Sequence, residues 1–179
     1  MLLYNIIMKI VTTPMCEEIV KLAGISDYAV NKHPTSEDGD FAILLSESKV
    51  DMDSLPIKLN TPSQVFESIK KVSEIAKNQL SDEDILAFFE GYELSKKYLN
   101  SDFKRDIDVK VYSEFLKDIV LDMGFNVDSD NFDYVVYPDY LKNKVEESEN
   151  LVEIPSHGDI SKNPFERIEV RYAILENLI

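Results

Sequence analysis

The 179-residue sequence is poor in several residue types that whole classes of site require. It has one cysteine, which excludes an intramolecular disulfide framework and any zinc or iron–sulfur site built from a cluster of cysteines. Its five glycines form neither a G-x-G-x-x-G motif nor a Walker sequence, so no glycine-rich phosphate loop is expected. No stretch approaches the roughly 20 apolar residues that a membrane-spanning helix needs, so no membrane partner is expected.

Positive charge is also scarce, because 19 Lys and Arg stand against 34 Asp and Glu, and the formal net charge is −15. The acidic excess is spread evenly along the chain. Residues 1–90 hold 15 acidic and 8 basic residues, giving −7, and residues 91–179 hold 19 acidic and 11 basic residues, giving −8. Binding to nucleic acid requires Lys and Arg in excess to neutralise phosphates, so this class of partner is excluded. The charge therefore indicates a solvated, self-repelling surface.

The beginning of the chain shows no convincing secretion signal. No positively charged segment precedes the apolar residues 1–8, and no small-residue cleavage site follows them. Met1 and Met8 are both plausible starts. A lone thiol stays reduced in the cytoplasm, so we expect a cytoplasmic protein. Its richness in Lys, Asn, Ile and Asp is typical of a low-GC prokaryote.

Apolar periodicity and helix caps predict strands that alternate with helices. The strands are expected at residues 9–13, 28–30, 41–45, 56–59, 109–111, 134–137 and 151–154. The helices are expected at residues 15–23, 82–98 and 112–123, after the caps Thr61 and Asn163, and as one or two turns in 139–149. The uninterrupted apolar run at 41–45 is typical of a strand that helices cover on both faces.

This alternation predicts an α/β fold: two small lobes of mostly parallel sheet flanked by helices and joined by a long helix. One doubly wound three-layer sheet is the alternative. The expected parts are an N-terminal lobe at residues 1–80, a connecting helix within 81–103 and a C-terminal lobe at 104–179. These parts could also pack as a single domain.

Several segments together carry a family resemblance. Residues 10–20 read Ile-Val-Thr-Thr-Pro-Met-Cys-Glu-Glu-Ile-Val, a strand, a turn and the start of a helix. Further matches are Leu-Ala-Gly-Ile-Ser-Asp at 22–27, Gly-Asp-Phe-Ala-Ile-Leu-Leu-Ser-Glu-Ser at 39–48 and Leu-Pro-Ile-Lys-Leu-Asn at 55–60. Residues 9–78 thus resemble the N-terminal lobe of the class III solute-binding fold, with Pro14 and Glu18 on the family's Pro and Glu.

That fold is shared by vitamin B12 and siderophore receptors and, more remotely, by tetrapyrrole chelatases and nitrogenase-type subunits. The resemblance implies two lobes, a connecting helix and a ligand in the cleft between the lobes. The sequence departs from the family in its short loop after the second strand, its small second lobe and its lack of a lipid-anchor cysteine near the N-terminus. A reduced cytoplasmic version of the fold is therefore expected, rather than a transport receptor.

In open α/β sheets ligands bind beyond the carboxyl ends of the strands. Four turns occupy such positions: residues 12–16, 46–48, 138–140 and 155–159. The candidate ligand-binding residues in and beside these turns are Thr12, Thr13, Cys16, Glu18, Ser46, Glu47, Tyr137, Asp139, Ser156 and His157.

Two of these candidates could carry chemistry. Cys16 lies near a helix N-terminus, which lowers a thiol pKa, but the adjacent acidic residues oppose this effect, and a small buried residue is the simpler interpretation. His157 is the candidate catalytic residue, as a general base, or else a capping or solvent-exposed loop residue. Nothing in the sequence brings Cys16, His33 and His157 together, so no metal site is predicted.

The leading hypothesis is a binding or assembly module that holds a small ligand or a protein partner without catalysis. The alternative is a small enzyme with His157 as acid/base and Cys16 or Glu18 assisting. A third is a pseudo-enzyme subunit that pairs through the aromatic helix at 82–98, which leaves a homo- or hetero-oligomer open. No cofactor can be identified from the sequence.

Overall fold

The computed structural model describes residues 8–145, 150–156, 158 and 160–179, which form two four-stranded parallel β-sheets. The first sheet has the strand order β2-β1-β3-β4 and the second the order β6-β5-β7-β8. The strands of the first sheet are β1 (Ile10–Thr12), β2 (Tyr28–Val30), β3 (Phe41–Leu45) and β4 (Ser54–Ile57). Those of the second are β5 (Asp108–Val111), β6 (Asn126–Val127), β7 (Tyr134–Pro138) and β8 (Leu151–Ile154).

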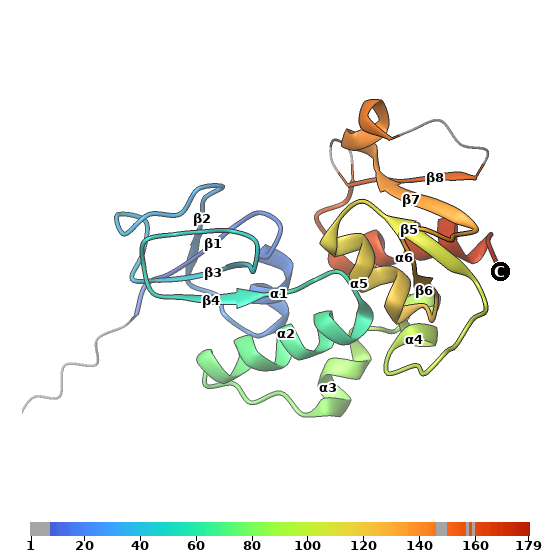
Figure 1. The fold of residues 1–179 in the computed structure, drawn as a ribbon. Coiled ribbons are helices and arrows are strands. Elements are labelled where there is room, and N and C mark those ends of the chain that lie inside the picture. Colours follow the sequence, from blue (N-terminus) through green and yellow to red (C-terminus); the bar gives the residue numbers. More distant parts are fainter. Residues whose placement is uncertain (1–7, 146–149, 157, 159) are drawn as a thin grey trace, which may run out of the picture.

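The predicted α/β fold of two mostly parallel lobes is thereby confirmed, and the alternative of one doubly wound sheet is wrong. In each sheet the first strand along the chain, β1 or β5, is an inner strand that pairs in parallel with a neighbour on each side. A parallel pair requires a crossover connection. The two lobes lie side by side in Figure 1, the first in blue to teal and the second in yellow to red.

Helices flank both sheets. They are α1 (Glu17–Leu22), α2 (Pro62–Ile75), α3 (Asp82–Ala87), α4 (Glu93–Tyr98), α5 (Glu114–Asp122), the 3₁₀ helix η1 (Asp139–Lys144) and α6 (Pro164–Glu176). The predicted caps are confirmed: the Thr61 side chain accepts from the backbone N–H of Gln64, and the Asn163 side chain accepts from those of Phe165 and Glu166. None of the helices in the described ranges is long and apolar enough to cross a membrane.

The prediction of one long connecting helix at 82–98 is wrong, since this segment forms the two short helices α3 and α4. Gly91 lies between them with φ +88°, a left-handed conformation that cannot continue a right-handed helix and that glycine adopts at low cost. The turn places Phe89 and Tyr92 against Phe165 of α6, each with ring centroids 4.9 Å apart. Packing of the turn on α6 thus accompanies the break in the helix.

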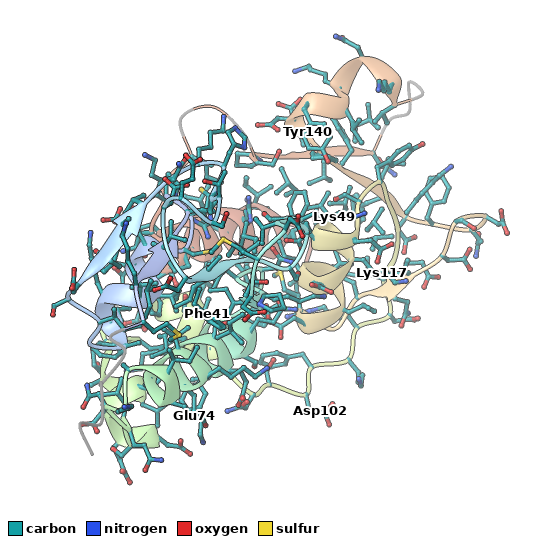
Figure 2. All side chains as sticks on the ribbon, turned by 90° about the vertical axis from the view of Figure 1, so that its left-hand side faces the viewer. Phe41, Lys49, Glu74, Asp102, Lys117 and Tyr140 are labelled. Carbon is teal, nitrogen blue, oxygen red and sulfur yellow. The ribbon has the colours of Figure 1, made fainter. Side chains whose placement is uncertain are left out.

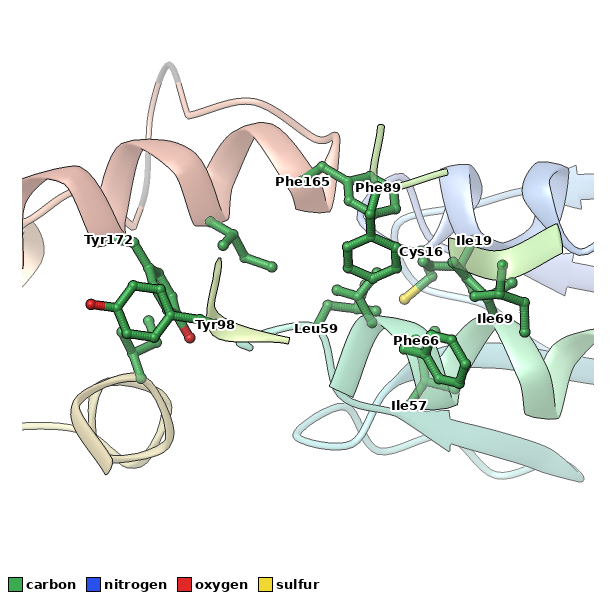
Figure 3. Packing of buried hydrophobic residues seen from close by; sticks show 14 of the residues in the cluster. Cys16, Ile19, Ile57, Leu59, Phe66, Ile69, Phe89, Tyr98, Phe165 and Tyr172 are labelled. Carbon is green, nitrogen blue, oxygen red and sulfur yellow. The ribbon is translucent and has the colours of Figure 1, made fainter. Parts of the chain in front are cut away.

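Aromatic packing connects the two lobes (Figure 3). Phe89 lies between Phe66 of α2 and Phe165 of α6, with ring centroids 6.4 and 4.9 Å apart. The buried cluster around these rings extends without interruption from Ile19 of α1 to Tyr172 of α6. The lobes therefore share one hydrophobic core along the face that the helices cover.

On the opposite face of the first sheet, a loop covers the strands where a helix was expected. The buried residues Val11, Ala42 and Leu44 pack there against Val50 and Met52 of the loop between β3 and β4, together with Ala29 of β2. This loop supplies the apolar cover that was expected from a second layer of helix. The same loop begins at the carboxyl end of β3, where a ligand is expected.

Candidate functional site

A pocket of about 560 Å³ lies between the two lobes, where the strands of both sheets end. The first lobe contributes Met15, Leu45, Glu47, Leu59 and Asn60 to its lining. The second lobe contributes Phe115, Tyr140, Ser156, Gly158, Ile160, Lys162, Arg167 and Arg171. The volume lies within the range of known sites for small organic molecules.

Each of the four turns singled out in the sequence reaches this pocket, through Met15, Glu47, Tyr140 and Ser156 respectively. The parallel strands explain this convergence, because their carboxyl ends lie at one edge of each sheet, and residues from both edges line the pocket. Of the predicted binding residues, Glu47 and Ser156 line the pocket. His157 lies outside the described residues.

Other predicted residues support the fold around the pocket rather than lining it. The buried Thr12 hydroxyl donates to the carbonyl oxygen of Ile43 at 2.8 Å, between neighbouring strands. The Tyr137 hydroxyl donates to Glu153 at 3.3 Å. Thr13 is buried, and Glu18 is half-buried on α1.

Two predicted residues orient the side chains that do line the pocket. Ser46 donates from its hydroxyl to Glu47 Oε1 at 3.0 Å. Asp139 accepts from the backbone N–H of Ser156 at 3.1 Å and also from its hydroxyl. Asp139 therefore fixes the turn after β8 through which Ser156 reaches the pocket.

Cys16 is placed as a core residue, since its side chain is fully buried and is not among the residues that line the pocket. Burial raises the pKa of its thiol to about 11, although a hydrogen bond with Thr13 acts in the opposite direction. At neutral pH the residue is therefore a protonated thiol, whereas nucleophilic attack and metal binding need the thiolate.

Sequence reasoning missed the cationic wall of the pocket, formed by Arg167 and Arg171 on α6 with Lys162 just before it. Arg167 and Arg171 are four positions apart on one helix, so they lie on the same face. They are two of the three arginines in the chain. The sequence therefore held one signal for this wall, namely two rare residues at helical spacing among the apolar residues of a predicted helix.

Both arginines are buried, with 3% of Arg167 and 6% of Arg171 exposed. Burial lowers the pKa of each guanidinium to about 10, and in Arg171 the charge of Arg167 acts in the same direction. The carboxylate of Asp139 partly opposes the shift in Arg171. Both side chains are still protonated at neutral pH, so the second lobe presents two buried positive charges to the pocket.

The described donor set of the pocket does not match a metal centre. Among the described lining residues, Glu47 is the one carboxylate, and neither histidine nor cysteine is present. No group of three His, Cys, Asp or Glu side chains able to hold a metal ion occurs in the described part of the chain. Arginine and lysine, by contrast, are donors without a lone pair to offer a cation.

No protein-family model and no curated protein matches the sequence. Solved structures do match its fold. A zinc-bound variant of AdcAII from Streptococcus pneumoniae has 14% identity and a TM-score of 0.56, over 95% of this chain and 97% of that one. The SBP FpvC from Pseudomonas aeruginosa, in complex with Mn²⁺, has 12% identity and a TM-score of 0.53, over 95% of this chain and 99% of that one.

Zinc-bound AdcA from Streptococcus pneumoniae also matches, with 13% identity and a TM-score of 0.51, over 96% of this chain and 57% of that one. The fold of this chain is therefore similar to that of these proteins, two α/β lobes with a pocket between them. At these identities the likeness establishes the fold alone.

Proposed function

We propose that this protein is a binding module that holds a small molecule between its two lobes and releases it unchanged. The observation that carries the proposal is the interlobe pocket, which receives a residue from each of the four strand-end turns. Its position corresponds to the general place of ligands in open α/β sheets. Similarity in fold to proteins solved with bound Zn(II) or Mn²⁺ supports ligand binding as the role of this architecture.

Binding without catalysis is favoured over the enzyme alternative by the chemistry of the described lining. Cys16, which would assist His157 in the enzyme alternative, is fully buried and does not line the pocket, and burial raises the pKa of its thiol. The titratable lining groups are Glu47, Tyr140, Lys162 and the two arginines. The hydroxyl of the lining residue Ser156 donates to the carboxylate of Asp139, but the described lining contains no histidine to complete a Ser–His–Asp arrangement.

A cytoplasmic location is part of the proposal. It rests on the single cysteine, because a lone thiol stays reduced in the cytoplasm. The proposal favours a small molecule over a protein as the principal partner, because the feature that the two lobes build together is concave and of small-molecule size.

The test is native mass spectrometry of the protein purified from its own host, compared with a variant whose pocket is filled. Ile160→Trp adds a large side chain to the half-buried pocket lining, whereas the matched Val127→Trp adds it to the exposed edge strand β6. The wild-type protein and Val127→Trp should retain the same small molecule, and Ile160→Trp should lose it. A wild-type protein that carries nothing, or equal retention by Ile160→Trp, would contradict the proposal.

A further inference from the structure

The pocket concentrates positive charge in a protein that is otherwise strongly acidic. Its described lining contains Lys162, Arg167 and Arg171 against the single carboxylate of Glu47. With Asp139, which holds the lining residue Ser156, the described charged residues at the site sum to +1, in a chain whose net charge is −15. Charged side chains elsewhere are spread over the whole outline of the molecule in Figure 2.

Contacts within the described protein use only part of the hydrogen-bonding capacity of the two arginines. Arg167 donates through Nη1 to the carbonyl oxygens of Ser161 and Lys162, at 3.1 and 2.7 Å. Arg171 donates through Nε to the carbonyl oxygen of Pro155 at 3.0 Å, and its guanidinium lies 4.9 Å from the ring centroid of Phe115. A guanidinium has five N–H donors, so each arginine keeps several that these contacts leave unused.

The unused donors are accessible from the pocket. In the described part of the chain, no fully buried side-chain nitrogen or oxygen lacks a hydrogen-bond partner. The free nitrogens, Nε and Nη2 of Arg167 and both Nη atoms of Arg171, must therefore reach open space, and both residues line the pocket. Neither arginine forms an ion pair with another described residue, although buried charges in proteins are normally paired.

Much of the remaining lining is apolar, beside the polar Asn60, Tyr140 and Ser156. Five side chains form this part of the surface: Met15, Leu45, Leu59, Phe115 and Ile160. Four of them come from elements other than α6 and its preceding loop, so apolar contact is available on the sides of the pocket away from the arginines. A ligand that fits both parts has one charged end and an apolar body.

We infer that the pocket recognises an organic anion, with a carboxylate or phosphate group bound by Arg167 and Arg171 and an apolar body against Leu45, Leu59 and Phe115. The inference rests on the proposed function and names its ligand class. Two guanidinium groups on one helix face match the oxygens of such an anion, because N–H donors in a planar fork bind carboxylate and phosphate in pairs. Binding also neutralises the two charges that the free protein leaves buried.

The experiment titrates the wild-type protein with a matched series of probes and follows the backbone amide signals of Phe115 and Ile160 by NMR. Benzoate and phenyl phosphate carry the two anionic groups on one apolar ring, benzamide is the uncharged analogue of benzoate, and benzylamine is a cationic one. Zn²⁺ is titrated separately. Benzoate or phenyl phosphate should shift these signals, and the better of the two identifies the anionic group, whereas benzamide and benzylamine should bind about 10-fold or more weakly.

Two variants assign the binding to the cationic wall. Arg171→Gln removes the guanidinium that Phe115 faces, and Lys162→Gln removes an exposed charge from the same wall without touching the core. Arg171→Gln should weaken binding of the anionic probe about 10-fold or more, and Lys162→Gln by a smaller factor. The control Lys117→Gln removes one positive charge from the exposed surface of α5 and should leave binding unchanged (Figure 2).

The inference is overturned if neither anionic probe binds, if benzylamine or Zn²⁺ shifts the pocket signals more strongly than benzoate and phenyl phosphate do, or if both pocket variants bind the anions as the wild type does. These outcomes differ from failure of the proposed function. If the wild type retains a neutral or cationic compound that Ile160→Trp loses, the proposed binding function stands and the inferred anionic ligand is excluded.

Discussion

Gln64 of α2 donates a hydrogen bond from its side-chain amide to Asp118 Oδ2 of α5 at 2.9 Å, so a helix of the first lobe holds a carboxylate of the second. The same oxygen accepts from Asn60 Nδ2 at 3.0 Å and from Lys58 Nζ at 3.1 Å. Because Asn60 also lines the pocket, this cluster fixes the distance between the lobes beside the ligand site.

Removing the acceptor should therefore destabilise the arrangement of the lobes. Asp118→Ala leaves three donors of the first lobe without their shared partner and should lower the free energy of unfolding by about 1–3 kcal/mol. Urea denaturation measures the change. The control Asp102→Ala removes a carboxylate from a side chain that is 93% exposed. This change should alter the free energy of unfolding by less than about 0.5 kcal/mol. Equal effects of the two changes would contradict the assigned role of Asp118.

The same cluster predicts a dependence of stability on pH. Burial alone would raise the pKa of Asp118, but hydrogen bonds from Gln64, Asn60 and Lys58 outweigh it and hold the pKa below its usual value of 3.8. A carboxyl group with a lowered folded pKa stabilises the fold above its unfolded pKa, and this contribution is lost as the pH falls through the folded pKa. The advantage of the wild type over Asp118→Asn should thus be full at neutral pH and shrink below about pH 4.

The measurement compares urea denaturation of the two proteins over a series of pH values. The difference between them is the quantity to follow, because burial raises the pKa of the neighbouring Asp122 and shifts the stability of both proteins in the opposite direction. A difference that stays constant between neutral and acidic pH would contradict the prediction.

Local signals predicted most of the fold. The caps Thr61 and Asn163 and the apolar runs at 28–30 and 41–45 depend on neighbouring residues, and the structure confirms them. The break at Gly91 was missed because the apolar spacing continues across it, while the turn packs against Phe165 some 70 positions later in the chain. The edge strand β6 was missed because it has two exposed residues and pairs with β5 alone.

Only the part of the candidate site that follows from the order of strands and helices could be predicted from the sequence. Strand ends identified the four turns, since parallel strands bring their carboxyl ends together. The arginines lie on α6, after the last of these turns. Their place in the pocket depends on how α6 packs against α4, α2 and β8. A helical pair of rare basic residues was visible in the sequence, but its burial is a tertiary property.

Cys16 should resist thiol reagents in the native protein. Its side chain is buried, and burial raises the pKa of the thiol to about 11, so thiolate is scarce at neutral pH. Iodoacetamide labelling followed by intact-mass measurement should show slow modification of the native protein and rapid modification in urea. Rapid labelling of the native protein would revive the enzyme alternative, in which this residue assists catalysis.

Two glycines with the same backbone conformation should respond differently to a methyl group. Gly91 and Gly124 have φ values of +88° and +87°, so alanine at either position costs about 1 kcal/mol through backbone strain. A Cβ at Gly91 would meet nothing within 4 Å, whereas one at Gly124 would lie 2.3 Å from the carbonyl oxygen of Phe103. Urea denaturation should therefore show a clearly larger loss for Gly124→Ala than for Gly91→Ala, and equal losses would contradict the close approach at Gly124.

The buried charge of Arg171 should lower the stability of the ligand-free protein. Arg171 makes one hydrogen bond, to a backbone carbonyl, and no ion pair within the described residues, and the carboxylate of Asp139 offsets its burial only in part. Arg171→Met therefore removes a buried charge and keeps a flexible apolar side chain against Phe115. The free energy of unfolding should rise by roughly 1 kcal/mol.

Arg105 provides the matched comparison. It donates to the carbonyl oxygen of Met123 at 2.7 Å and to the Tyr98 hydroxyl at 2.8 Å, so Arg105→Met should lower the free energy of unfolding by about 1–3 kcal/mol. Thermal and urea denaturation of both variants in phosphate-free buffer measure the contrast. If Arg171→Met loses as much stability as Arg105→Met, Arg171 is a structural residue. A gain would mean that the protein retains a costly charge in its pocket, as a site for an anion requires.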